Sequence, residues 1–254
     1  MSEQASGSAD PGRGPDADRR GALRVSDLRV RYNGVAAVKG ISFSVAPGET
    51  VGLIGPNGAG KSSTLLALMG AVPATGSVRI DGVELLGLPP ERMVRHGLGL
   101  VPEGRHIFGH LSVAGNLRLG LVGRRSQDGA DRDMAWVREL FPILAEFSGR
   151  PAGLLSGGQQ QQLAIARALL ADPDILMLDE PSLGLSPTAI DTVFDALAAV
   201  KERGTGILVV EQRAEYTIAF ADRTQVMHEG ELTLALTPES ASDEELLTRA
   251  YFGS

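Results

Sequence analysis

The fold class of this chain is indicated most clearly by the sequence Gly55-Pro56-Asn57-Gly58-Ala59-Gly60-Lys61-Ser62. The apolar run at residues 50–54 precedes it and is typical of a buried strand, while residues 61–69 predict a helix. The glycines let the main chain curl so that successive N–H groups converge on one point. Because those groups also lie at the start of a helix, the loop favours a bound anion.

The spacing of this stretch fits G-x-x-x-x-G-K-[ST], the pattern of a phosphate-binding loop, and its strand and helix stand in the required order. Lys61 can reach the β- and γ-phosphates of a nucleotide, and the Ser62 hydroxyl is placed to bind Mg²⁺. A glycine-rich turn with an accidental lysine is the alternative, which the spacing and both flanks disfavour. We therefore predict a site for the phosphates of a nucleotide, and its residues are Gly55, Pro56, Asn57, Gly58, Ala59, Gly60, Lys61, Ser62 and Ser63.

Two acidic residues follow a second apolar run, at residues 175–178, which has the pattern of a strand buried on both faces of a parallel sheet. Asp179 ends this strand, and ligands of α/β proteins bind at the carboxyl ends of such strands. Glu180 follows directly. An isolated Asp-Glu pair would be a solvated strand end, but the phosphate-binding loop upstream favours a functional role for this pair.

Leu155-Ser156-Gly157-Gly158-Gln159 predicts the start of a further helix. Ser156 is a good N-cap and Gln159 stands three residues later, which is the spacing of a capping box. Gly157 and Gly158 leave the first turn without side chains, so its free N–H groups can face an anion. On these residues alone, an ordinary capped helix explains the stretch equally well.

The composition limits the classes of function. The chain has 254 residues, a formal net charge of −7 and no cysteine. The acidic balance argues against a nucleic-acid partner, and the missing cysteines exclude disulfides, thiolate metal sites and cysteine nucleophiles. No apolar run reaches the length of about 20 residues that spans a bilayer, so a membrane role requires a partner. Residues 1–21 lack the apolar stretch of a signal peptide and predict a disordered tail.

Outside these motifs, the spacing of apolar residues predicts strands in the amino-terminal part of the chain and helices in its middle. Alternating apolar residues at 28–32 and 41–45 predict half-buried antiparallel strands. Asp81-Gly82 predicts a hairpin over residues 77–85. Residues 103–154 are more helical, around a polar loop predicted at residues 123–132.

Taken together, these motifs resemble the ATP-binding subunits of ABC transporters over residues 23–254. LSGGQ at residues 155–159 is similar to the signature of that family, and Asp179-Glu180 is similar to its Walker B pair. The resemblance implies an α/β fold, with a P-loop NTPase core, a mostly parallel central sheet, an antiparallel β subdomain and an inserted α-helical subdomain at about residues 103–154. Residues 22–254 then form one ATP-binding domain after the tail.

The resemblance also implies roles in the chain's own nucleotide site. Asp179 and Ser62 hold Mg²⁺, and the residue at the Glu180 position polarises the attacking water as a general base. Tyr32 matches the aromatic residue that stacks on adenine, although a core position in its strand is the alternative for this side chain.

Other motifs point to a second subunit. In the family, the residues matching Ser156, Gly157, Gly158 and Gln159 cap the γ-phosphate of the ATP that a partner subunit holds. Residues 182–186 match the loop that crosses the dimer interface, but many relatives carry Asp where Ser186 stands. Residues 103–111 match the segment that contacts a cytoplasmic helix of the permease.

Two residues depart from the family pattern. ABC ATPases usually carry Gln, which touches Mg²⁺ and the attacking water, where Glu103 stands. They usually carry His, which contacts the γ-phosphate, where Gln212 stands. A Glu carboxylate binds Mg²⁺ well but donates no hydrogen bond unless it is protonated, and Gln has no charge that follows pH. We predict that Glu103 is a metal ligand. We also predict that Glu103 and Gln212, together with Glu180, are catalytic residues.

These departures resemble one branch of the family. Residues 101–108, the pair Glu211-Gln212 and the ending at residues 249–253 are similar to the smaller ATPase subunit of branched-chain amino-acid importers. That branch implies a second, different ATPase subunit, two membrane permeases, an extracytoplasmic solute-binding protein and a place at the cytoplasmic face of the membrane. The alternatives are a urea or short-chain amide importer, a soluble ABC ATPase outside transport, and a regulatory subunit that binds ATP without hydrolysing it.

Overall fold

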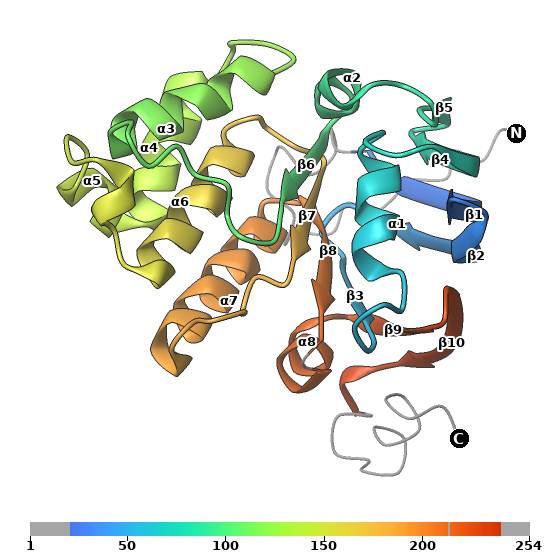
Figure 1. Ribbon diagram of the computed structural model, residues 1–254. Helices are drawn as coiled ribbons and strands as arrows, with labels where there is room; N and C mark the ends of the chain where they lie inside the picture. Colours follow the sequence, from blue (N-terminus) through green and yellow to red (C-terminus); the bar gives the residue numbers. More distant parts are fainter. Residues whose placement is uncertain (1–20, 213, 240–254) are drawn as a thin grey trace, which may run out of the picture.

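The computed structural model describes residues 21–212 and 214–239. The predicted tail at residues 1–21, apart from Gly21, and the ending at residues 249–253 therefore lie outside the described residues. The described part consists of two sheets and a group of helices (Figure 1).

Strand β3 (Thr50–Ile54) lies inside a six-stranded sheet of order β10-β9-β3-β8-β7-β6. β3 pairs in parallel with β8 and β9, and β7 pairs in parallel with β6 and β8. Within the described residues, only β10 runs antiparallel to its neighbour in this sheet, β9. The α/β fold with a mostly parallel central sheet is thereby confirmed. The other strands of this sheet are β6 (Leu98–Val101), β7 (Ile175–Asp179), β8 (Gly206–Glu211), β9 (Arg223–His228) and β10 (Glu231–Leu236).

A second sheet is antiparallel and has the order β2-β1-β4-β5. Asn33 and Gly34 join β1 to β2 with φ angles of 47° and 88°, the left-handed conformations of a tight hairpin turn. Both strands are longer than predicted, because β1 already begins at Leu23 and β2 at Val35. Asp81-Gly82 joins β4 to β5, which confirms the predicted hairpin. The bounds are β1 (Leu23–Tyr32), β2 (Val35–Val45), β4 (Ala74–Ile80) and β5 (Val83–Glu84).

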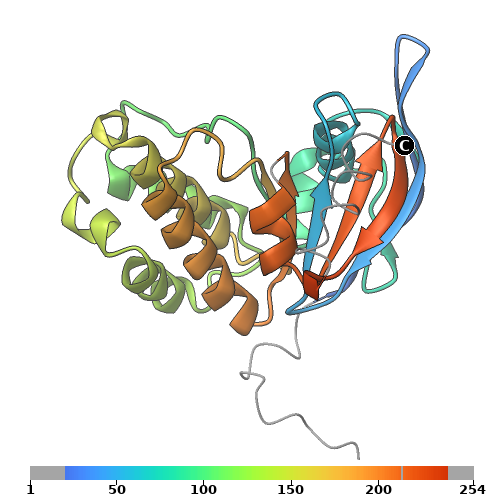
Figure 2. The same ribbon diagram turned by 90° about the horizontal axis from the view of Figure 1, so that it is seen from below.

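The two faces of the central sheet belong to two hydrophobic cores. In β7, Ile175 and Met177 pack in the core shared with the antiparallel sheet and helix α1, while Leu176 and Leu178 pack in the core shared with α6 and α7. Burial on both faces explains why this strand reads as a continuous apolar run. Figure 1 and Figure 2 show the antiparallel sheet on one side of the central sheet and helices α3 to α7 on the other.

Helix α1 lies at its predicted position and helices α3 to α5 lie in the stretch predicted to be helical, whereas α2 and α8 were not predicted. Helix α6 starts at Gly157, inside the signature stretch, and packs against α3. The helices are α1 (Lys61–Leu68), α2 (Pro90–Arg95), α3 (Val113–Gly120), α4 (Ala130–Leu140), α5 (Pro142–Glu146), α6 (Gly157–Leu169), α7 (Pro187–Glu202) and α8 (Ala214–Phe220), with 3₁₀ turns at Leu121–Gly123 and Ala152–Leu154.

The loop predicted at residues 123–132 is shorter than expected. Helix α4 begins at Ala130, because Gly129 adopts a left-handed φ of 75° at its N-cap. The buried guanidinium group of Arg124 organises the start of the loop, since it forms a 2.9 Å ion pair with Asp133 and donates to the carbonyl of Leu170. The prediction that polarity marks the whole stretch as loop was therefore wrong at its carboxyl end.

Candidate functional site

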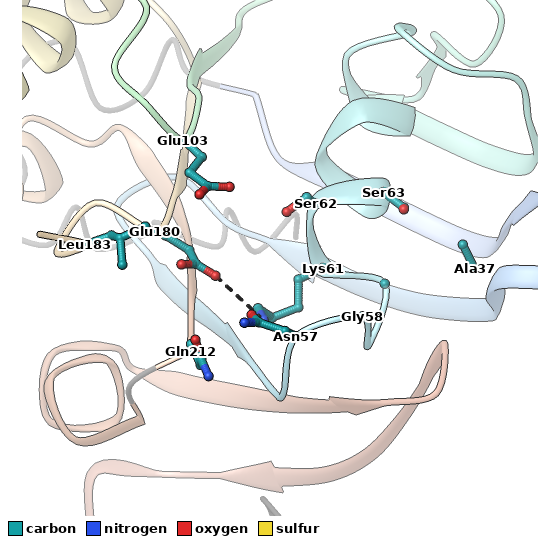
Figure 3. Close-up of a pocket in the computed structure, with 11 residues that line it drawn as sticks. Ala37, Asn57, Gly58, Lys61, Ser62, Ser63, Glu103, Glu180, Leu183 and Gln212 are labelled. Carbon is teal, nitrogen blue, oxygen red and sulfur yellow. Dashed lines mark ion pairs between the residues drawn. The ribbon is translucent and has the colours of Figure 1, made fainter. Parts of the chain in front are cut away.

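A cavity of about 450 Å³ lies where the carboxyl ends of the central strands meet helix α1. The loop after β3 forms one wall, and residues that follow β6, β7 and β8 form the other (Figure 3). Parallel pairing brings these strand ends to one edge of the sheet, although they are far apart in the sequence. The lining residues are Ala37, Asn57, Gly58, Gly60, Lys61, Ser62, Ser63, Glu103, Glu180, Leu183 and Gln212.

The loop around the cavity requires glycine at several positions. Gly55 and Gly60 have φ angles of 155° and 108°. A Cβ atom at Gly55 would lie 2.1 Å from the carbonyl oxygen of Met227, and one at Gly60 would lie 2.3 Å from the carbonyl oxygen of Ala37. Gly58 has a φ of 83° and faces open space. The main chain therefore curls as predicted, and the residues present fit a phosphate group.

Lys61 lies inside this curl. Its side chain is 4% exposed, and Nζ donates to the carbonyl oxygens of Gly55 at 2.8 Å and Pro56 at 3.2 Å. Nζ also lies 3.9 Å from Oε1 of Glu180. Burial lowers the pKa of Lys61, while Glu180 and other nearby carboxylates oppose this shift. The site thus holds a buried cation that a phosphate can compensate.

Oxygen donors gather opposite the lysine. The Ser62 hydroxyl donates to Oδ1 of Asp179 at 3.3 Å, and Figure 3 shows Glu103 and Glu180 facing the same space. Burial raises the pKa of Asp179; the hydrogen bond from Ser62 counters this, and the charges of Glu180 and Glu103 raise it further. A cation at this point would relieve the repulsion among these acids.

This donor set fits Mg²⁺. Hydroxyl and carboxylate oxygens are its preferred ligands, and Mg²⁺ commonly takes one or two carboxylates together with substrate phosphates. Within residues 21–212 and 214–239, no cluster of three or more His, Cys, Asp or Glu side chains forms a metal site by itself.

Glu180 has an unusual backbone. Its φ is 47°, a left-handed conformation that residues with side chains seldom adopt. Its main-chain N–H donates to the carbonyl of Val210 at 2.8 Å. The neighbouring strand thus fixes the residue whose carboxylate faces Lys61.

The structure also shows residues that the sequence interpretation missed. Glu211 ends β8, is 3% exposed, and accepts a 2.8 Å hydrogen bond from the N–H of Ser182. Ala37 and Leu183 line the cavity. An acid at the end of an apolar strand run was a usable signal for Glu211, whereas nothing in the sequence distinguishes Ala37.

The predicted signature residues lie elsewhere. Ser156 caps α6 and forms the predicted capping box with Gln159. The main-chain N of Ser156 lies 2.9 Å from Oε1 of Gln159, and the main-chain N of Gln159 lies 3.4 Å from Oγ of Ser156. Neither these two residues nor Gly157 and Gly158 line the cavity. They therefore lie apart from the phosphate-binding loop of their own chain, and their contact with a second subunit stays a prediction.

The predicted residues Gly55, Pro56, Ala59 and Asp179 lie close to lining residues in the sequence but do not line the cavity themselves, and Tyr32 and Ser186 also stand outside it. Tyr32 ends β1 at the hairpin turn, is 41% exposed and does not line the cavity. Its exposure disfavours the core alternative, while an adenine contact stays a prediction. Ser186 caps α7 by accepting a hydrogen bond from the N–H of Ala189. This cap gives Ser186 a structural role.

The comparison with known families agrees with this geometry. A family model described as ABC transporter matches residues 38–183, more than half of the chain. The chain belongs to the ABC transporter family. It is an ATP-hydrolysing, nucleotide-binding subunit of a transporter, and it works with a second ATPase subunit and with membrane permeases. In the described part of this ABC ATPase, no helix has the length and apolar character needed to cross a membrane.

Two relatives and one solved structure indicate its place in the family. The ABC ATPase is 40% identical over 232 residues to the high-affinity branched-chain amino acid transport ATP-binding protein BraG of Pseudomonas aeruginosa, which covers 91% of this chain and 99% of BraG. It is 33% identical over 240 residues to the lipopolysaccharide export system ATP-binding protein LptB of Escherichia coli, covering 91% and 97%. The ADP conformation of MJ1267, an ATP-binding cassette of an ABC transporter, matches with a TM-score of 0.80 at 24% identity, covering 92% and 99% of the chains. This last likeness concerns the fold alone.

Proposed function

We propose that this ABC ATPase energises the uptake of branched-chain amino acids through partner permeases at the cytoplasmic face of the membrane. The observation that carries the proposal is the 40% identity to BraG over nearly the full length of both chains. Glu103 and Gln212, the two departures that resemble the smaller ATPase subunit of such importers, both line the nucleotide cavity and support it.

The residues of the cavity receive roles on this proposal. Lys61 and the main chain of the loop hold the phosphates of ATP, and Glu180 acts as general base toward the attacking water. Ser62, Asp179 and Glu103 would hold Mg²⁺, which supplies charge neutralisation of the phosphates when it is bound. Gln212 donates to the γ-phosphate from the opposite wall, and Tyr32 stacks on the adenine.

The second ATPase subunit is proposed to differ from this chain. In the closed dimer, residues 156–159 of this chain complete the partner's site, and the partner's signature completes this one. Binding of both nucleotides favours closure, because only the closed state satisfies both halves of each site.

An apolar surface supports the contact with a permease. Phe108 is 53% exposed, Leu111 42% and Leu154 77%, and they come from segments joined by a 2.8 Å hydrogen bond from Ala152 N–H to the carbonyl of Leu111. Buried Asn116 fixes Phe108 through two hydrogen bonds to its main chain. Exposed apolar groups on such a rigid base are typical of a docking surface.

The proposal is tested by transport. The full chain is purified with the membrane subunits that accompany it, reconstituted in liposomes with the associated solute-binding protein, and assayed for ATP-dependent uptake of labelled leucine, isoleucine and valine, with urea and short-chain amides as competitors. We expect uptake of leucine that Glu180→Gln abolishes. Uptake of urea or amides alone, export of a lipid as for LptB, or a chain that purifies without membrane subunits would contradict the proposal.

A further inference from the structure

Glu211 is a buried carboxylate with a specific partner. A carboxylate that is 3% exposed requires hydrogen bonds to compensate for its lost hydration. Its Oε1 atom accepts one, at 2.8 Å, from the main-chain N–H of Ser182, which is itself 6% exposed. Burial raises the pKa of Glu211, and the hydrogen bonds from Ser182 act against this shift. The end of β8 therefore reaches across to the loop that follows β7.

Ser182 stands in the turn that carries Glu180. The N–H of Leu183 donates to the carbonyl of Glu180 at 3.1 Å and closes this turn, and the Leu183 side chain beyond it is 53% exposed. Glu180 opens the turn in its left-handed conformation. Such a conformation persists only where the surrounding structure fixes it.

Consecutive residues of β8 hold the turn at two points. The carbonyl of Val210 accepts from the N–H of Glu180 at 2.8 Å, and the carboxylate of Glu211 accepts from the N–H of Ser182. The first bond fixes Glu180 itself and the second fixes the segment behind it. With both in place, Oε1 of Glu180 points across the cavity toward Lys61 (Figure 3).

We infer that Glu211 is a positioning residue for ATP hydrolysis, which holds the turn at residues 180–184 through the N–H of Ser182 so that the Glu180 carboxylate faces the phosphate-binding loop. The inference rests on the general-base role proposed for Glu180 and is independent of the transported solute. The turn requires an acceptor atom with the reach of Glu211, and it does not require the negative charge. Without that acceptor, β8 holds the turn only through the hydrogen bond from the N–H of Glu180 to the carbonyl of Val210. The turn can then rotate about this hydrogen bond, and Glu180 can leave its left-handed conformation.

Three substitutions of Glu211 distinguish the effects of its side-chain length, its negative charge and its hydrogen-bond acceptor. Glu211→Gln keeps the length and an acceptor oxygen, Glu211→Met keeps the length without an acceptor, and Glu211→Asp keeps the charge but loses the reach. In the complex with its partner subunits, we expect Glu211→Met and Glu211→Asp to lower kcat by about 10–100-fold, as a displaced catalytic group does. The kcat of Glu211→Gln should stay within about threefold of the unsubstituted protein, because its neutral hydrogen bond is weaker but correctly placed. Affinity for MgATP, measured by equilibrium binding, should stay unchanged in all three.

Asp174 supplies the matched control. It is a buried carboxylate, 2% exposed, beside the amino end of β7, and it pairs with Arg125 at 2.8 Å. Asp174→Leu should lower the melting temperature without lowering kcat. If Glu211→Met does not fold, the comparison of Glu211→Asp with Glu211→Gln still decides. The inference is overturned by full kcat in Glu211→Met and Glu211→Asp, by equal losses of kcat in Glu211→Gln and Glu211→Met, or by a parallel loss of MgATP binding. Full turnover in Glu180→Gln would instead overturn the role of Glu180.

Discussion

Nζ of Lys61 lies 3.9 Å from Oε1 of Glu180 across the phosphate-binding loop, while the same Nζ donates to the carbonyl oxygens of Gly55 and Pro56. The ammonium group is therefore buried between two neutral acceptors and a carboxylate at the edge of ion-pair distance. Charged acceptors form stronger hydrogen bonds to such a group than carbonyl oxygens do. A phosphate that enters the loop thus improves the environment of Lys61.

Lys61→Ala should weaken nucleotide binding. A hydrogen bond to a charged group contributes about 1.5–3 kcal/mol, so its loss corresponds to roughly a 10- to 150-fold higher Kd for MgATP. Equilibrium binding of a fluorescent ATP analogue measures the change. Lys39→Ala is the control, because Lys39 faces Glu231 at the surface at 3.7 Å and does not line the cavity. Unchanged affinity in Lys61→Ala would contradict the proposed role.

Glu180→Gln should separate binding from hydrolysis. The amide keeps the size of the side chain but cannot accept the proton of the attacking water, and removal of a general base costs about 10²–10⁴-fold in rate. Nucleotide affinity should be retained, and ATP should remain trapped in a closed dimer. Turnover and nucleotide retention are measured in the assembled complex. Full turnover would exclude Glu180 as the base.

Much of the site was predictable because its elements are local in sequence. The spacing around Lys61 specifies the strand, the loop and the helix together, and the apolar run before Asp179 places that carboxylate at the correct edge of the sheet. The capping box of Ser156 and Gln159 also formed as predicted. In each case, short-range sequence patterns determine short-range geometry.

What could not be predicted depends on contacts between distant segments. The bond from Ser182 to Glu211 joins residues 29 positions apart, and it exists only because β7 and β8 are neighbours in the sheet. The left-handed φ of Glu180 is likewise imposed by β8, since nothing about the residue type favours it. The early start of α4 follows from Gly129 and from Arg124 packing on Asp133, which local polarity does not reveal.

Glu84, in strand β5 of the antiparallel sheet, should make the free energy of unfolding depend on pH. Partial burial acts to raise its pKa, but hydrogen bonds from Ser77, from the N–H groups of Val78 and Leu86 and from Arg79 lower the pKa of Glu84 to about 2, below the ordinary value of 4.5. Because the folded pKa is lowered, the stabilisation is present above pH 4.5 and is lost as the pH falls toward 2.

Glu84→Gln measures this contribution. The side chain is 42% exposed, so solvent screening limits the effect at neutral pH to about 1 kcal/mol, or roughly 2–4 °C in Tm. The difference from the unsubstituted protein should shrink between pH 4.5 and pH 2. Exposed Glu202 on α7 provides the control, since Glu202→Gln should change Tm little at any pH. A Glu84→Gln difference that stays constant with pH would contradict the expectation.

Ser156→Ala should act mainly on the partner's nucleotide. Ser156 lies outside the cavity of its own chain, so the loss of its hydroxyl should lower hydrolysis at the partner's site by about 10²-fold, as the loss of one positioned donor does. Ser112→Ala is matched, because Ser112 caps α3 in the same way, at 3.0 Å from the N–H of Gly115. Both substitutions should cost about 1 kcal/mol of stability, but only Ser156→Ala should lower turnover.

The two sites of the dimer should also differ in rate before any substitution. Paired with a subunit that carries Gln and His at the positions of Glu103 and Gln212, this chain should hydrolyse ATP more slowly in its own cavity than the partner does. Glu103 adds negative charge beside the phosphates, and Gln212 lacks a charge that can assist the γ-phosphate. Photolabelled nucleotide trapped in each subunit separately reports the two rates. The double substitution Glu103→Gln with Gln212→His should raise trapping in this chain and leave the partner's site unchanged, whereas equal rates at the two unsubstituted sites would refute the asymmetry.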